Sequence, residues 1–207
     1  MSLRSTFSGT PCDADHKPCC EIVIERSKWQ IEIECRTCAL RSGLMPRLPF
    51  DPIDEAARQW ANHWSGVPAM HAVTSLMRVQ QLVIGRLDTI LKPHGLTFAR
   101  YEALVLLTFS SRGSLPLGKM GERLQVHPTS VTSIVRKLEA DRHVVRRPHP
   151  QDGRAVLAEI TRAGRDVVQA ATTDLVGADF GLGVLDDDAL GRLSELLRPV
   201  RRAAGDF

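Results

Sequence analysis

The sequence predicts a mainly α-helical fold that carries one small β-hairpin beside a pair of short helices. Three observations support this prediction. From Ile53 onward, apolar residues recur at intervals of three and four, which is the period of an amphipathic helix. Two extended runs within residues 144–160 flank an Asp-Gly pair, a strong signal for a hairpin turn. No apolar run approaches the roughly eighteen residues of a membrane span.

The composition is that of an ordinary soluble protein, with 207 residues of which 43% are apolar and 25% charged. The first residues lack a continuous apolar segment, so we expect a cytoplasmic protein with no membrane partner. The net charge is only +3, but residues 119–154 hold eight basic and four acidic residues, a local excess of +4. Phosphate groups attract such a basic stretch, although a solvated surface gives the same pattern.

Residues 1–44 differ in character from the rest of the chain. All five cysteines fall within the first 38 residues. The runs 21–25 and 29–34 predict two short strands, of which the second alternates isoleucine with polar or charged residues. A proline-rich stretch then marks a boundary. We therefore predict an extension at 1–44 and the main domain at 45–207.

The main domain is predicted to be a succession of helices that the hairpin interrupts once. Apolar periodicity places the helices, and proline or glycine residues end them. Thr97 is a suitable N-cap for the third helix. The predicted helices are 54–64, 69–91, 98–109, 117–124, 127–141, 161–175 and 186–202, and the predicted strands are 144–147 and 155–160.

The helices at 117–124 and 127–141 form a helix-turn-helix pattern. Four apolar residues of the second helix fall on one stripe: Val131, Ile134, Val135 and Leu138. Its other face is small and hydroxylated, with Arg136 and Lys137 a turn further along. Small polar side chains let a helix enter the major groove of DNA, where arginine reads guanine through two hydrogen bonds. An ordinary surface helix is the alternative, but such helices expose Glu and Lys instead.

The hairpin after this helix is short and basic. Its predicted tip, residues 148–154, contains no apolar side chain that a core could bury. Arg146, Arg147 and Arg154 surround the tip, and a narrow minor groove attracts arginine. A basic ribbon beside a helix-turn-helix is a wing, so the predicted fold is a winged helix-turn-helix. An idle hairpin explains neither the arginines nor their placement.

The winged motif resembles the MarR family of regulators. Residues 117–124 are similar to the first helix of the family motif, and residues 127–139 are similar to its recognition helix. Asp152-Gly153-Arg154 matches the family's wing signature of Asp, any residue, Arg. The segment 158–164 resembles the transition, in this family, from the last strand of the wing into the following helix. The order of helices extends the resemblance to about residues 53–207.

The resemblance implies a homodimer, formed through N- and C-terminal dimerisation helices, that binds pseudo-palindromic operator DNA and usually represses transcription. It also implies a small-molecule effector in a cleft between these helices and the DNA-binding lobe, about residues 97–161. Some relatives sense peroxide through cysteine, but residues 39–207 contain none. Candidate cleft residues are His71, Met77, Arg100 and Tyr101. Their favoured interpretation is nevertheless that they are core or surface residues.

Side chains of the helix-turn-helix and the wing are expected at the DNA. We expect Thr132 and Arg136 to read bases in the major groove. Arg154 is expected to anchor the wing in the minor groove, with Asp152 holding it in position. The full set of expected DNA-binding residues is Lys119, Pro128, Thr129, Ser130, Thr132, Ser133, Arg136, Lys137, Arg147, Asp152 and Arg154.

The cysteines of the extension raise the question of a metal site. Cys19, Cys20, Cys35 and Cys38 flank the predicted N-terminal hairpin, and thiolates are zinc ligands. One Cys-x-x-Cys pair is a common pattern, however, and the glycines that shape zinc knuckles are missing. A poorly ordered tail and a true translation start at Met45 are together the favoured alternatives. We therefore expect that no cofactor is required in this protein.

Two other classes of function compete with DNA binding. The sequence has no glycine-rich phosphate loop, nucleophile elbow or His-Glu-x-x-His motif, so we expect no enzymatic activity. The other alternative is a helical protein-interaction module without specific DNA binding.

Overall fold

The structure, a computed structural model, describes residues 21–25, 30–34 and 48–207, with side chains described for 48–152 and 155–207. The chain divides into two compact units, Met1–His71 and Ala72–Phe207. The domain boundary predicted between residues 44 and 45 lies outside the described residues and stays a prediction.

The N-terminal unit contains the predicted hairpin and one short helix. Strands β1 (Glu21–Glu25) and β2 (Gln30–Glu34) pair antiparallel, which confirms the hairpin. Helix α2 (Pro52–Ala61) begins two residues earlier than predicted, because the Asp51 carboxylate accepts a hydrogen bond from the Ile53 amide at 2.8 Å and caps the helix. The predicted end at residue 64 was wrong, since the helix ends at Ala61.

The long helix predicted at 69–91 confirms the apolar periodicity, and its end shows a cap that the sequence did not reveal. Helix α3 (Val67–Leu91) is followed by a 3-10 turn, η1 (Lys92–His94), and by α4 (Phe98–Phe109). Thr97 occupies the N-cap position of α4, but its side chain makes no capping hydrogen bond. Instead, the Asp88 carboxylate of α3 accepts from the Phe98 amide at 2.6 Å. This bond ties the start of α4 to the end of α3.

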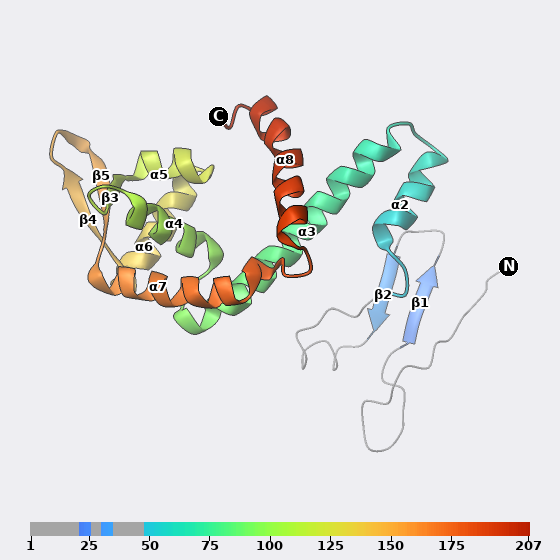
Figure 1. Cartoon of the computed structure of the whole chain (residues 1–207), viewed down its shortest axis with the longest axis horizontal. Helices are drawn as coiled ribbons and strands as arrows, with labels where there is room; N and C mark the ends of the chain where they lie inside the picture. The colour runs from blue at the N-terminus through green and yellow to red at the C-terminus, as the bar shows by residue number, and fades with distance from the viewer. Residues whose placement is uncertain (1–20, 26–29, 35–47) are drawn as a thin grey trace, which may run out of the picture. The chain divides into compact units, whose positions relative to one another are not determined.

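The wing belongs to a three-stranded antiparallel sheet. The strands are β3 (Ser114–Pro116), β4 (Val144–His149) and β5 (Asp152–Ile160), in the order β3-β5-β4. Strand β3 was not predicted, because we expected a turn up to residue 114. In Figure 1 the β4–β5 hairpin projects from the helices of the lobe.

The turn of the wing differs from the prediction. His149 pairs with Asp152, so the turn consists of Pro150 and Gln151, and Asp152-Gly153 lies inside β5. A proline with its fixed φ suits the first central position of a turn, which Pro150 occupies. The Asp-Gly pair therefore predicted the hairpin correctly but its centre wrongly.

Two helices complete the second unit. Helix α7 (Arg162–Gly177) is capped by Thr161, whose hydroxyl accepts from the Gly164 amide at 3.0 Å. A short 3-10 turn, η2 (Asp179–Gly181), leads to α8 (Asp187–Ala203). The Asp186 carboxylate caps α8 through the Ala189 amide at 2.8 Å. Both helices match the predicted ones within about two residues.

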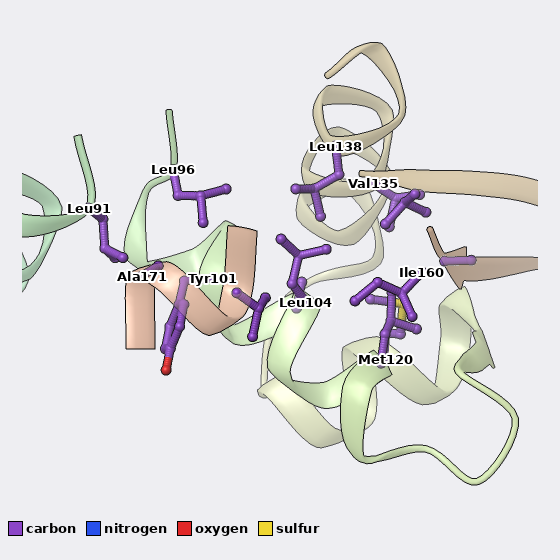
Figure 2. Packing of buried hydrophobic residues seen from close by; sticks show 14 of the residues in the cluster. Leu91, Leu96, Tyr101, Leu104, Met120, Val135, Leu138, Ile160 and Ala171 are labelled. Carbon is purple, nitrogen blue, oxygen red and sulfur yellow. The ribbon is translucent and has the colours of Figure 1, made fainter. Parts of the chain in front are cut away.

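The core of the second unit lies between α4, the helix-turn-helix and α7. Helices α5 (Leu117–Leu124) and α6 (Pro128–Ala140) pack against α4. Figure 2 shows Leu104 of α4 among Met120, Val135 and Leu138 of these two helices. All four side chains are fully buried. The recognition motif is therefore held on a rigid apolar base.

Apolar side chains outside this core stay exposed on the long helices. Leu82 of α3 is 66% exposed, and Leu196 of α8 is 72% exposed. A single chain leaves these apolar stripes exposed to water, and exposed apolar patches of this kind are typical of protein–protein interfaces. Among the described residues, no helix has the length and hydrophobicity to cross a membrane.

Candidate nucleic-acid interface

The turn between α5 and α6 is fixed by its backbone. Gln125 adopts a left-handed conformation with φ of 53°, and its amide donates to the Gly121 carbonyl to end α5. A side chain at Gly121 would lie 3.3 Å from the Val126 carbonyl and from a methyl of Val131, so the close approach of the two helices favours glycine here. The first helix therefore sets the direction of the second.

Helix α6 has the two faces that the sequence predicts. Three residues of the apolar stripe are buried, and Ile134 is half-buried. Thr132 is also half-buried, at the border of the exposed face. The residues of α6 that are both exposed and predicted at the DNA are Pro128, Thr129, Ser130, Ser133, Arg136 and Lys137.

The hydroxyl groups of α6 fall into two kinds. The Thr132 hydroxyl donates to the Pro128 carbonyl at 3.0 Å. The Thr129 hydroxyl lies 3.1 Å from Nδ1 of His127, and the same nitrogen accepts from the Thr129 amide at 3.3 Å. Among the described residues, neither Ser130 nor Ser133 has a side-chain hydrogen bond. The two serine hydroxyls are therefore available to a ligand.

Four cations around the motif already have a carboxylate partner. Two of them lie on the helices: Lys119 of α5 is 3.1 Å from Glu122, and Lys137 of α6 is 3.7 Å from Asp141. Within the described part of the chain, Arg136 makes no ion pair and stands exposed on α6. On the exposed face of α6, Arg136 can therefore bind a base without first breaking an ion pair.

The wing arginines are held by acidic residues that sequence reasoning missed. Arg146 of β4 binds Glu139 of α6 at 2.7 Å, and Arg147 binds Glu159 of β5. Exposed pairs of this kind contribute about 0–1 kcal/mol, so phosphate can replace the carboxylate at little cost. The cross-strand register is the signal for the second pair, since Glu159 faces Val145, two residues from Arg147.

Two predicted wing residues are only partly described. Asp152 is exposed at the start of β5 and takes part in an interaction of its own. Arg154 belongs to the same strand, but its side chain lies outside the described residues. The predicted support of Arg154 by Asp152 therefore stays a prediction.

The candidate cleft residues His71 and Met77 both lie on α3. His71, in the N-terminal unit, has its Nε2 atom 2.9 Å from the Asp54 carboxylate. Met77 is 54% exposed on the part of α3 that belongs to the second unit. Neither observation identifies a ligand pocket, and both residues stay predictions.

The other two cleft candidates lie on α4 and have partners within the fold. Arg100 donates to the carboxylate of Asp141 at 3.4 Å, which links α4 to the end of α6. Tyr101 is buried, and its hydroxyl lies 2.9 Å from that of Thr172 on α7. Figure 2 shows the Tyr101 ring beside Ala171. Both contacts give these side chains structural roles, which agrees with the favoured interpretation from sequence.

The predicted zinc ligands Cys19, Cys20, Cys35 and Cys38 lie outside the described residues, so the zinc interpretation stays a prediction. In the segments that the structure describes, no group of three His, Cys, Asp or Glu side chains is placed to hold a metal ion.

Comparison with known proteins identifies the family. The sequence profile of the MarR family matches residues 94–155, which contain the helix-turn-helix and most of the wing. The crystal structure of Sco5413, a MarR family transcriptional regulator from Streptomyces coelicolor, is 58% identical with a TM-score of 0.65. This likeness covers 69% of the present chain and 99% of that chain. The chain belongs to the MarR family of transcriptional regulators.

Two further matches differ in how much of each chain they cover. Sco3205 of Streptomyces coelicolor, a MarR family regulator crystallised with DNA, is 22% identical with a TM-score of 0.62, a likeness of fold. It covers 68% of this chain and 94% of that chain. An uncharacterised HTH-type transcriptional regulator of Mycobacterium leprae is 36% identical over 66 residues, 32% of this chain and 46% of the relative. The chain thus spans about half the length of that curated relative.

Proposed function

We propose that this MarR family protein is a homodimeric transcriptional regulator that binds a pseudo-palindromic operator through its winged helix-turn-helix. The observation that carries the proposal is the exposed face of α6. Small polar side chains surround Arg136, which has no ion-pair partner among the described residues, and the opposite face of α6 is buried in the apolar core. A helix of this kind can enter the major groove while the basic wing follows the neighbouring phosphates.

The exposed apolar stripes support the homodimer. Val79 and Leu82 of α3 are 48% and 66% exposed, and Leu196 and Val200 of α8 are 72% and 62% exposed. Burial of apolar surface contributes about 25 cal/mol per Å², so covering these side chains favours association. A second copy of the chain carries the same stripes and can bury them in a two-fold interface.

The proposal includes a repressor whose affinity for its operator falls when a small-molecule effector binds, as is typical of the family. Of the candidate cleft residues, Met77 is exposed on the part of α3 that belongs to the second unit, and it is the first position to test for this effector. We propose no enzymatic activity, because the motif that the chain preserves is a DNA-binding one.

The experiment is a selection of bound duplexes from a random pool of double-stranded DNA by the full chain. We expect enrichment of one pseudo-palindromic sequence whose half-site centres lie about 10 bp apart. Arg136→Ala is the test variant, and Arg162→Ala is the control, because it removes the same charge from an exposed site on α7, away from the apolar stripes of α3 and α8.

The outcomes separate the candidate functions. Enrichment of one sequence by wild type and by Arg162→Ala, with a weaker base preference in Arg136→Ala, supports the proposal. Binding without enrichment of any sequence contradicts it and favours a protein-interaction module. Light scattering tests the assembly in parallel, and a stable monomer at micromolar concentration contradicts the homodimer.

A further inference from the structure

We propose that Thr129 and Thr132 recognise thymine through their methyl groups, while Arg136 recognises guanine further along the same major groove. This inference rests on the proposed function and specifies its substrate. It assigns the sequence preference of the recognition helix to two apolar contacts and one charged contact. From sequence alone, the hydroxyl groups of this helix are the expected reading groups, and the structure points to a different chemistry.

The hydrogen bonds within α6 lead to this assignment. The Thr132 hydroxyl donates its hydrogen to the Pro128 carbonyl at 3.0 Å, so it has no donor left for a base. The Thr129 amide donates to Nδ1 of His127 at 3.3 Å, so that nitrogen is an acceptor. The Thr129 hydroxyl lies 3.1 Å from the same nitrogen, so it too is engaged within the protein. Both threonines engage their hydroxyl groups within the protein, and each also carries a methyl group that a partner can contact.

The chemistry of the major groove supplies the matching group. Thymine alone among the four bases presents a methyl group there, and apolar contact with it is an established means of readout. Thr129 and Thr132 are one turn apart, a rise of about 4.5 Å along the helix. Neighbouring base pairs are about 3.4 Å apart. Two methyl contacts to adjacent or nearly adjacent base pairs are thus within reach of this helix.

The serines of α6 cannot supply the same preference. Ser130 and Ser133 are exposed, and their hydroxyls have no partner among the described residues. A free hydroxyl can donate or accept, so it accommodates any base or a phosphate. Arg136, four residues beyond Thr132, makes no ion pair in the described part of the chain and offers a fork of donors to the two acceptors of guanine. Base preference therefore falls on the two threonines and on Arg136.

The experiment replaces thymine by deoxyuridine, which removes the methyl group from DNA and leaves the protein unchanged. Each thymine of one half-site in the duplex recovered by selection is replaced in turn, and affinity is measured by fluorescence anisotropy. Three proteins are compared for Thr132: wild type, Thr132→Val, which keeps a methyl and lacks the hydroxyl, and Thr132→Ser, which does the reverse. Thr129→Ser provides the same test for the other threonine.

We expect one thymine whose replacement weakens binding about fourfold for wild type and for Thr132→Val, the effect of one methyl-sized apolar contact. The same replacement should leave Thr132→Ser unchanged, because its partner methyl is already missing. A second thymine should behave in this way toward Thr129→Ser. Equal deoxyuridine effects in wild type and both serine variants, or none at all, overturn the inference. So does a loss of sequence preference in Thr132→Val.

The result also separates this inference from the proposed function. If wild type enriches no sequence from the random pool, the proposed function and the methyl readout both fail. If wild type enriches an operator and the deoxyuridine scan is silent, only the methyl readout fails. Circular dichroism of each variant confirms that the protein is folded, and the deoxyuridine effect on wild type needs no variant at all.

Discussion

The junction between the wing and α7 gives a sharp test of the fold, through the substitution Gly164→Ala. A methyl group at this position would lie 2.2 Å from the His143 carbonyl oxygen and 2.8 Å from a side-chain carbon of Ile160. One neighbour is main chain and the other is a buried residue that is 5% exposed, so neither can move cheaply. The start of α7 must therefore shift away from the base of the wing.

The cost follows from the bonds at this junction. The His143 carbonyl accepts from the Thr161 amide at 3.0 Å and from the Thr161 hydroxyl at 3.1 Å, and a shift of α7 weakens both bonds. Overpacking costs about 1–3 kcal/mol, and two lost hydrogen bonds add about 1 kcal/mol each. The helix preference of alanine over glycine offsets about 1 kcal/mol. The free energy of unfolding should fall by about 2–4 kcal/mol.

The assay is urea unfolding followed by circular dichroism at one fixed protein concentration, because dimerisation contributes to stability. Gly118→Ala is the control, since this exposed glycine lies within α5, away from the apolar stripes of α3 and α8, and a methyl there meets no atom within 4 Å. It should raise the free energy of unfolding by up to about 1 kcal/mol. A Gly164→Ala protein as stable as wild type, or a shift of both variants in the same direction, would refute the reasoning.

Four further predictions concern DNA binding and pH. Arg136→Ala should weaken binding to the selected operator by about 1–3 kcal/mol and leave scrambled DNA unaffected in the same titration. Arg154→Ala should weaken both DNAs alike and lower the slope of log affinity against log salt by about one; unchanged binding would exclude the wing as a contact. A chain starting at Met45 should keep its operator affinity within about tenfold, with or without a chelator, and a larger loss would assign a role to the extension. Partial burial raises the pKa of the Glu102 carboxyl above its ordinary value of 4.5, so the folded protein loses stability as pH rises through the raised pKa; Glu102→Gln should melt slightly higher than wild type at pH 7 and lose this advantage at pH 4.

The helix-turn-helix was predictable because its signals are local. The bounds of α5 agree with the predicted 117–124, and α6 begins at Pro128, where proline costs no hydrogen bond. The apolar spacing of α6 also predicted which residues face the core, since Val131, Val135 and Leu138 are buried. Patterns of period 3.6 and the residues that end helices were sufficient for this part of the site.

The features that the sequence did not predict depend on contacts between distant segments. Strand β3 has three residues and no periodicity of its own, and it exists because it pairs with β5. The capping of α4 by Asp88 and the pairing of Arg147 with Glu159 likewise need the folded arrangement. The hydrogen bond from the Thr132 hydroxyl to the Pro128 carbonyl joins residues close in sequence, but only the structure reveals that this bond forms.

The most direct test of the central claim is a footprint of the full chain on the DNA around its own gene. Dimethyl sulfate reports guanine N7 in the major groove, and hydroxyl radicals report the sugars. We predict two protected guanine clusters about one helical turn apart, with protected sugars where the wings reach the minor groove. Arg136→Ala, at a concentration that restores binding, should lose the guanine protection and keep the sugar protection. Guanines that remain unprotected with wild type, or remain protected with Arg136→Ala, would contradict the claim that α6 reads the operator.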